Sequence, residues 1–382
     1  MTRRGRWTLA LLTAVLIGAA IYVSTVRRTD RAAGVDELLY PALEASLDEV
    51  TSIRIRGPGE TTAVTLERAE SGWRVAERAG YPADASRVRT LLLGLAQART
   101  IEEKTTLPEN YPSLGVEDLA TPGATGTGVE LEGPAEPVSL IVGKSPGARS
   151  SYIRRKGEPA SWQIGTALTV ERDPAKWLAT DLLDIGADRI QSAEFTTDGK
   201  RRWTAAKASR ADQSFKVTGK PAGGSGPDTE SSAGGVATAL AGLRLVDVRP
   251  AKDAAKDKPA ATATYRTFDG LVLAIDGYAE GDKRYVRVSP SVDETVAHRF
   301  FVATAAPAGK DGAAESAPPK PPAAEASGQA SGGKSAPATS PEGVVAQTRE
   351  EATKLETRLA GWSFEIPDWS YDAIFPGKSV SR

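Results

Sequence analysis

Cysteine is absent from this 382-residue sequence, and histidine occurs only once, at His298. The absence of cysteine excludes disulfides, thiolate metal sites and cysteine nucleophiles. With one histidine, a Ser-His-Asp triad of the usual form would need His298 as its base. His298 lies in VDETVAHRF with no partner motif beside it, so we interpret it as a solvated side chain.

An excess of positive charge is also missing. Lysine and arginine total 48 against 49 aspartate and glutamate residues, which gives a formal net charge of −1. Non-specific nucleic-acid binding usually needs overall positive charge, so nucleic acid is not an expected partner. The 40% hydrophobic and 25% charged residues are typical of a globular protein. A chain of this length has room for two domains or for one duplicated domain.

One long uncharged run stands near the N-terminus, WTLALLTAVLIGAAIYVSTV (Trp7–Val26). Its length matches the roughly 20 residues that a helix needs to cross the hydrocarbon core of a bilayer. The run therefore predicts a single-pass transmembrane helix, with bilayer contact through residues 7–26. A signal peptide cleaved after the small residues Gly18-Ala19-Ala20 is the alternative. The apolar run continues beyond that point through Val23, which favours an uncleaved helix.

The arginine count does not decide the orientation of this helix. Three arginines precede the run and three follow it: Arg3, Arg4, Arg6 and Arg27, Arg28, Arg31. The short N-terminal tail favours an orientation with the N-terminus in the cytoplasm. Residues from about 35 onward are then expected outside the cytoplasm.

Short alternating runs follow this segment, and each predicts a strand with one buried face. They are VTSIRIRG, AVTLERA, GWRVAE, GVELEG, VSLIVGK, SSYIRRK and SWQIG. Within this series, YPADASRVRTLLLGLAQAR predicts a helix that Asp84 or Ser86 can cap. Its apolar residues share one stripe: Val88, Leu91, Leu92, Leu95 and Ala98. RDPAKWLATDLLDI predicts a closing helix with Asp173 as its N-cap.

The second half of the chain repeats the first in the same order. LAQARTIEE (Leu95–Glu103) returns as LAGLRLVDV (Leu240–Val248), and DEVTSIRI (Asp48–Ile55) as DRIQSAEF (Asp188–Phe195). Shorter matches keep this order: VTL with WTA, WRV with FKV, LIV with LAI, and YIR with YVR. Because the order includes a helix, the sequence predicts an α+β fold with two tandem, duplicated modules, each an antiparallel sheet plus a helix.

The predicted domains follow from these matches. Residues 1–34 form the cytoplasmic tip and transmembrane anchor, 35–187 the first module, and 188–304 the second. Residues 305–343 are rich in Ala, Pro, Gly and Ser and predict a disordered linker. Residues 344–382 predict a C-terminal helix and strand that complete the second module.

No motif identifies a catalytic, cofactor-binding or metal-ligating residue. GQASGGKS (Gly328–Ser335) has the spacing of a phosphate-binding P-loop, but neither a strand nor a helix is predicted beside it. The acidic pairs Asp181/Asp184 and Glu102/Glu103 lack a calcium-loop pattern, and we interpret them as solvated structural carboxylates.

Four tryptophans fall at equivalent points of the two halves: Trp162, Trp177, Trp362 and Trp369. A stacking platform for sugars is one interpretation of such a set. Packing in the core or between the two copies is the simpler one, and we favour it. YPSLGVED (Tyr111–Asp118) contains Pro112 and Gly115 and predicts a fixed turn between helix and sheet.

Several phrases together carry a family resemblance. They are VTSIRI, YPADA, YPSLGVED, LIVGKS, YIRRKG, WLATDLLDI and RLAGWSFEIP, behind one N-terminal apolar run. The chain resembles a bacterial family of membrane-anchored domains of unknown function, an auxiliary component of gliding-motility-type ABC transport systems. The resemblance implies a single-pass protein of the bacterial inner membrane, with its folded part in the periplasm beside ABC transporter subunits. It supplies no catalytic residues.

The expected function is therefore that of a non-catalytic accessory protein without a cofactor, which docks on a transporter or captures its cargo. A structural scaffold of the cell envelope and an envelope hydrolase that uses carboxylates are the alternatives. A deep cleft with convergent carboxylates would favour the hydrolase. An exposed apolar or edge-strand surface would favour docking.

Overall fold

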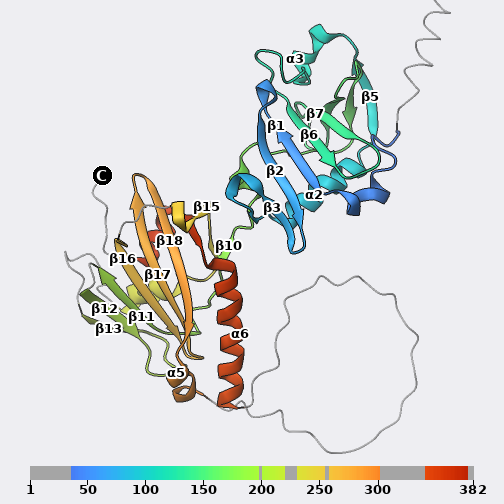
Figure 1. Cartoon of the computed structure of the whole chain (residues 1–382). Helices are drawn as coiled ribbons and strands as arrows, with labels where there is room; N and C mark the ends of the chain where they lie inside the picture. The colour runs from blue at the N-terminus through green and yellow to red at the C-terminus, as the bar shows by residue number, and fades with distance from the viewer. Residues whose placement is uncertain (1–35, 198–199, 220–229, 254–257, 302–339, 377–382) are drawn as a thin grey trace, which may run out of the picture. The chain divides into compact units, whose positions relative to one another are not determined.

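The computed structural model describes residues 36–197, 200–219, 230–253, 258–301 and 340–376. These residues form two compact units that divide between Thr180 and Asp181 (Figure 1). Each unit contains one large sheet in which all neighbouring strands are antiparallel. The predicted α+β class, rich in antiparallel sheet, is confirmed. The sequence places the start of the second module at residue 188, seven residues beyond the division in the structure.

Two predicted segments lie wholly or mostly outside the described residues. The predicted transmembrane run, residues 7–26, lies outside the described residues, and so do residues 305–339 of the predicted linker. Among the helices that the structure describes, none is both long and apolar enough to cross a membrane. The description resumes at Ser340, and a helix begins at Pro341. The last three residues of the segment predicted as linker are therefore helical.

The first unit is built on a nine-stranded sheet. Its strands, in spatial order, are β4 (Tyr81–Pro82), β3 (Gly72–Val75), β2 (Thr62–Ala69), β1 (Ser52–Arg56), β6 (Thr127–Glu132), β7 (Val138–Val142), β8 (Ser151–Arg155), β9 (Ser161–Ile164) and β5 (Thr100–Thr105). The strand runs expected from alternation are all present. Alternation buries one face, because successive side chains point to opposite sides of a strand. Ile53, Ile55, Val64 and Leu66 accordingly lie on the buried side of β1 and β2.

Helix α2 (Ala85–Ala96) covers part of this sheet. Asp84 is its N-cap, and the carboxylate accepts hydrogen bonds from the main-chain N–H groups of Ser86 and Arg87 at 2.9 and 3.2 Å. The predicted apolar stripe is buried throughout: Val88, Leu91, Leu92, Leu95 and Ala98. The helix ends where LAQARTIEE begins its turn into β5. This part of the sequence prediction is confirmed.

The remaining helical pieces of the first unit are short. They are α3 (Tyr111–Leu114) and the 3-10 turns η1 (Glu44–Glu49), η2 (Pro58–Glu60), η3 (Ala76–Arg78), η4 (Pro108–Asn110) and η5 (Pro174–Trp177). The predicted closing helix is wrong in extent, because only η5 is helical there. Asp173 does cap it, accepting from the N–H of Ala175 at 3.0 Å. Beyond η5 the chain becomes extended and enters the second unit.

The second unit has an eight-stranded sheet. Its strands, in spatial order, are β13 (Lys216–Gly219), β12 (Lys200–Ala206), β11 (Ile190–Thr197), β16 (Ala261–Thr267), β17 (Leu271–Glu280), β18 (Lys283–Val292), β19 (Trp362–Ile366) and β15 (Asp247–Pro250). A two-stranded sheet pairs β10 (Asp181–Leu183) with β14 (Leu243–Arg244). The helices are α4 (Glu230–Thr238), α5 (Glu294–Arg299), α6 (Pro341–Leu359) and α7 (Asp368–Ile374), with the 3-10 turn η6 (Ala251–Asp253).

The C-terminal helix α6 packs against β17 and β18 (Figure 1). Arg189 at the start of the unit joins it to the sheet, with Nη2 2.8 Å from Glu351 and 2.7 Å from Asp269. The hydrogen bonds that Arg189 donates to Glu351 come first among the causes that raise the pKa of Arg189, and burial opposes them. Strand β19 then inserts between β18 and β15. The residues after the predicted linker thus supply both a helix and an inner strand.

The two large sheets share one strand order. From β1 the first sheet continues as β6-β7-β8-β9-β5, and from β11 the second continues as β16-β17-β18-β19-β15. On the other side, β2-β3 corresponds to β12-β13, and only the first sheet has a further strand, β4. In each sheet one helix, α2 or α4, lies in sequence between the third strand and the last edge strand. The equivalence concerns the topology of each unit taken by itself.

Candidate functional site

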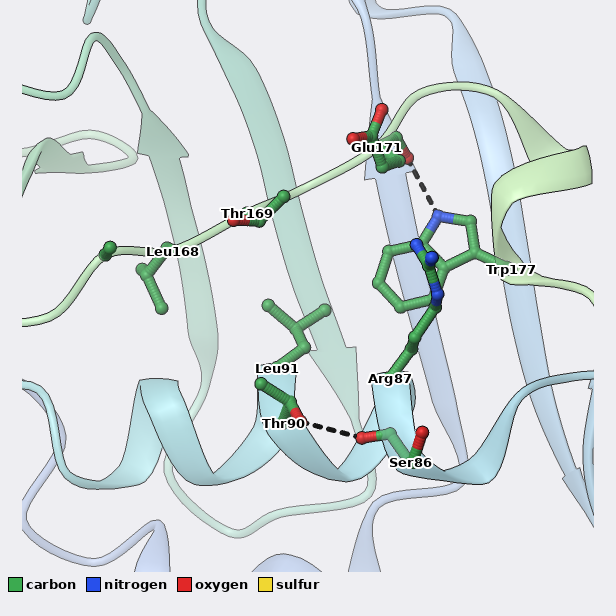
Figure 2. Close-up of a pocket in the computed structure, with 9 residues that line it drawn as sticks. Ser86, Arg87, Thr90, Leu91, Leu168, Thr169, Glu171 and Trp177 are labelled. Atoms are coloured by element: carbon green, nitrogen blue, oxygen red, sulfur yellow. Dashed lines mark hydrogen bonds between the residues drawn. The ribbon is translucent and has the colours of Figure 1, made fainter. Parts of the chain in front are cut away.

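A groove in the first unit lies between α2 and the extended segment Ala167–Glu171 (Figure 2). Its volume is about 170 Å³. Leu91, Leu168 and Trp177 supply the apolar part of its lining. The indole N–H of Trp177 donates to the main-chain oxygen of Glu171 at 2.9 Å, which fixes the ring against the extended segment. The groove is thus lined by one helix and by a segment without regular structure.

The polar groups of the groove come mainly from the first turn of α2. Thr90 Oγ1 donates to the main-chain oxygen of Ser86 at 2.8 Å, so this hydroxyl is already satisfied. Burial disfavours the charged form of Asp84, but hydrogen bonds from Ser86 and Arg87 outweigh it and lower the pKa of that carboxyl. Arg87 Nε lies 3.6 Å from Asp84, and the Arg87 side chain remains half exposed. The groove therefore carries one accessible cation.

The hydroxyl groups of Ser86 and Thr90 in this groove are already hydrogen-bonded. The Ser86 hydroxyl donates to the Asp84 carboxylate at 2.6 Å. That carboxylate also caps α2, and the hydrogen bonds that lower its pKa make it a weak base. The volume is below the roughly 300–1,000 Å³ of typical small-molecule pockets. It suits one apolar side chain or a similarly small group, with Arg87 beside it.

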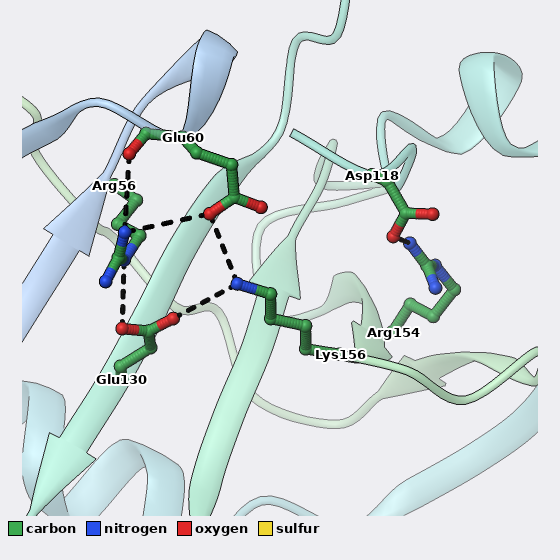
Figure 3. Close-up of polar contacts among 6 residues, drawn as sticks. All are labelled: Arg56, Glu60, Asp118, Glu130, Arg154 and Lys156. Atoms are coloured by element: carbon green, nitrogen blue, oxygen red, sulfur yellow. Dashed lines mark hydrogen bonds and ion pairs between the residues drawn. The ribbon is translucent and has the colours of Figure 1, made fainter. Parts of the chain in front are cut away.

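A second constellation surrounds Arg154 on β8, whose side chain is 4% exposed. Its Nε donates to the Val116 carbonyl at 2.8 Å, and Nη1 donates to the Glu158 carbonyl at 3.0 Å. Nη2 pairs with Asp118 (Figure 3), and the guanidinium lies 4.7 Å from the centre of the Tyr111 ring. A planar group with several donors can satisfy all of these acceptors at once. Arg154 therefore holds the YPSLGVED loop on the sheet.

Close main-chain contact completes the seat of this loop. A Cβ atom on Gly143 would lie 2.3 Å from the Leu114 oxygen, and one on Gly126 would lie 2.5 Å from the Gly115 oxygen. Gly115 itself has a φ of 72°, which favours glycine. Lys144 Nζ donates to the carbonyls that end α3, those of Pro112 and Ser113, both at 3.1 Å. The YPSLGVED loop thus packs against a surface to which LIVGKS and YIRRKG contribute.

Charged residues beside this loop pair with one another (Figure 3). Arg56 Nε lies 2.9 Å from Glu130, and Lys156 Nζ lies 3.2 Å from Glu60 and 3.4 Å from Glu130. Burial disfavours the charged form of Lys156, but its two carboxylate partners outweigh this and raise its pKa. Each carboxylate has a cation within reach, as in a structural network.

The acidic pairs noted in the sequence do not converge on a site. Asp181 lies 3.2 Å from Arg244, and Asp184 accepts from the Gly242 N–H at 3.0 Å. Glu102 pairs with Lys104 at 2.7 Å, while Glu103 is half-buried on β5. Within the described ranges, no group of three or more His, Cys, Asp or Glu side chains could hold a metal ion.

The other sequence candidates divide between the two units. Trp177 is buried, but Trp369 on α7 is 74% exposed, so the prediction of core packing for Trp369 is wrong. The aromatic residues that α7 buries are Tyr371 and, just after it, Phe375, which pack at Gly277. His298 is exposed on α5, as predicted for a solvated side chain. The P-loop-like Gly328–Ser335 lies outside the described residues.

Fold and groove together define a sheet-rich α+β protein with a small, mainly apolar binding groove. The family described as "Domain of unknown function (DUF4340)" matches residues 73–264, which is half of the chain, and the protein belongs to this family. No curated protein and no solved structure matches the chain.

Proposed function

We propose that this protein is a membrane-anchored accessory protein of an ABC-type transport system. In this proposal residues 7–26 cross the bacterial inner membrane and the two units lie in the periplasm. The units dock on transporter subunits or capture cargo without catalysing a reaction. The association with ABC transport comes from the resemblance of the phrases quoted above.

The observation that carries the proposal is the short length of chain between the apolar run and the first residues that are hydrogen-bonded to the first unit. Asp36 N–H donates to the Thr100 carbonyl at 2.7 Å, and Leu39 N–H donates to the Ala98 carbonyl at 2.8 Å. Leu39 and Tyr40 are buried, and Arg155 donates to the Leu39 carbonyl. Only residues 27–35 separate the apolar run from this attachment, a reach of at most about 30 Å. A short tether supports a working position at the membrane surface rather than a long scaffold.

We further propose that the two units are copies of one ancestral module. The shared strand order supports this interpretation, as does the repeated phrase LAQARTIEE/LAGLRLVDV at the same topological position. In each unit the first described residues, which we call the leading segment, pair with that phrase. The ion pairs are Asp36 with Arg99 in the first unit and Asp181 with Arg244 in the second. Duplication would give the protein two related surfaces for one assembly.

The lack of native cysteine allows a direct test of location. Asp48 is fully exposed in the first unit, so D48C should react with a membrane-impermeant maleimide in intact spheroplasts. The matched variant T2C should react only after the membrane is permeabilised. Equal labelling of both variants in intact spheroplasts would contradict the proposed topology.

Association with a transporter is tested separately. In-cell crosslinking of the full-length protein, followed by purification from detergent-solubilised membranes, should recover ABC transporter subunits. Correct topology without any transporter subunit would favour the scaffold alternative. Hydrolysis of envelope material by the purified protein, lost on substitution of a single carboxylate, would favour the hydrolase.

A further inference from the structure

The outer edge of β5 is open beyond its first residue. The leading segment pairs with Ala98–Thr100 through the Leu38–Arg99 bridge and the Thr100 N–H, which donates to the Glu37 carbonyl at 3.0 Å. Asp36 has a φ of 62° and turns the chain at that point. From Ile101 to Lys104, no strand or side chain of the described residues pairs with the outer edge. Unpaired main-chain groups at a sheet edge can bind a further strand.

The opposite edge of the same sheet is covered. Ala83 forms a bridge with Leu178, and the Ala179 N–H donates to the Pro82 carbonyl at 3.0 Å. The main chain around η5 therefore occupies the positions that an additional strand would take beside β4. In the first unit the open edge is that of β5.

The equivalent edge of the second unit is protected. In β15, the Val248 N–H donates to the Asp247 side chain at 2.8 Å, and Pro250 has no N–H. Proline and side-chain capping are common ways to prevent pairing at an edge strand. At the positions that correspond in the repeated phrase, β5 carries Glu103 and Thr105. The two units thus differ at the one edge where β5 and β15 correspond.

Apolar exposure marks the same place. Ile101 is 46% exposed, and its counterpart in the repeated phrase, Val246, is 47% exposed. On the same stretch of chain, Glu103 of β5 and Glu37, whose carbonyl accepts from the Thr100 N–H, have no cation partner among the described residues, whereas Glu102 is paired with Lys104. The open edge therefore combines one apolar side chain with surplus negative charge.

We propose that β5 is a docking strand, which binds an extended segment of a partner protein in which apolar and basic residues alternate. The segment adds to the sheet at Ile101–Lys104 through main-chain hydrogen bonds. One of its apolar side chains covers Ile101, and its lysine or arginine side chains face Glu37 and Glu103. This inference does not depend on the identity of the transport system.

Other occupants fit the edge less well. A second copy of the chain, paired edge to edge, would bring Glu102 and Glu103 against the same residues of its partner, and like charges across strands are destabilising. An anionic lipid surface would be repelled by the same carboxylates. The irregular pairing of β5 with β9 and the presence of Lys104 also limit indiscriminate strand addition.

The test measures the affinity of full-length protein in detergent for a short capped peptide of alternating valine and lysine, by fluorescence anisotropy. Replacing lysine by glutamate in the peptide should weaken binding about tenfold or more. N-methylation of alternate amides, which removes main-chain donors but keeps the charge, should weaken it similarly. I101D should reduce the affinity of the lysine peptide, whereas the matched V246D in the second unit should not.

Any of three results would overturn the proposal. The first is no detectable binding of the lysine peptide, which would also follow if another part of the chain covered the edge. The second is equal binding of the parent and N-methylated peptides, which would indicate charge attraction alone. The third is an equal loss of affinity in I101D and V246D. Circular dichroism of both variants checks that each remains folded.

Discussion

Arg244 lies 3.2 Å from Asp181, and this pair has the same place in the second unit that Arg99 and Asp36 have in the first. In each unit the aspartate is the first described residue of that unit, and the arginine lies shortly after α2 or α4 in the sequence. The repeated phrase is therefore the point where each unit binds its own leading segment. It serves the architecture of both units.

The apolar positions of this joint should matter far more than its ion pair. Leu240 is fully buried, so L240A should lower the free energy of unfolding by about 2–5 kcal/mol. R244A should lower it by less than about 1 kcal/mol, because both charged side chains are mostly exposed. Urea denaturation of the two variants measures the difference. Equal effects would mean that the joint depends on the ion pair.

Glycine should be required where the YPSLGVED loop meets the sheet. G143A places a Cβ atom 2.3 Å from the Leu114 oxygen and should destabilise the first unit by about 1–3 kcal/mol. Gly147 provides a matched control, because a Cβ atom there meets nothing closer than 3.9 Å. Thermal unfolding should show a lowered midpoint for G143A and little change for G147A. A tolerated G143A would show that the loop can move off the sheet.

Lysine should not replace arginine at position 154. R154K keeps the charge, but a lysine cannot reach Val116, Glu158 and Asp118 together. The substitution should lower the free energy of unfolding by about 2–4 kcal/mol. R87K, at a half-exposed arginine, is the control and should be nearly neutral. Limited proteolysis within residues 111–118 gives a second measurement that is specific to the loop. Protection equal to that of the wild type would contradict the assigned role of Arg154.

Stability should fall in alkaline solution. Burial raises the pKa of Tyr40 to about 12, although Arg155 and a hydrogen bond to Ser139 oppose it, and burial also raises the pKa of Tyr371 to about 12. Unfolded tyrosine ionises near pH 10, so these residues stabilise the fold fully below pH 10. Their contribution is lost as the pH rises from about 10 to 12, at up to about 1.4 kcal/mol per pH unit for each tyrosine.

Denaturant unfolding at several pH values measures this slope. Y40F should reduce it in the first unit, and Y371F should do so in the second. An unchanged slope in both variants would show that other groups govern the alkaline transition.

The chain between Ala305 and Thr339 should be dispensable for folding. Deletion of residues 305–339 keeps Ser340, whose hydroxyl accepts from the Gly343 N–H at 3.1 Å and caps α6. This deletion should leave membrane insertion and the circular dichroism spectrum intact. S340A in the full chain should lower the free energy of unfolding by about 1 kcal/mol, because it removes the N-cap of α6. Failure of the deletion variant to fold would show that the segment takes part in the structure.

Most local elements of the first unit could be predicted from the periodicity of apolar residues. Alternation identified seven strands of the first unit, β1 to β3 and β6 to β9, but not β4 or β5. The stripe from Val88 to Ala98 identified α2. Burial of one face imposes a period of two residues on a strand and of 3.6 residues on a helix. The sequence did not distinguish the short 3-10 turn η5, which ends at Trp177, from a longer helix. Both structures bring apolar residues that are close in sequence onto one side. Nor did the sequence distinguish Trp369 from Trp177, because burial depends on what packs against each ring.

Contacts between residues far apart in the sequence could not be predicted in this way. Residues 111–118 could be predicted as a turn, yet the seat formed by Gly126, Gly143 and Arg154 depends on strand pairing across the sheet. The groove beside Trp177 likewise forms where α2 meets a segment about eighty residues later in the chain. The open edge of β5 has the same origin. Whether a strand is central or at an edge depends on long-range register, which local periodicity does not encode.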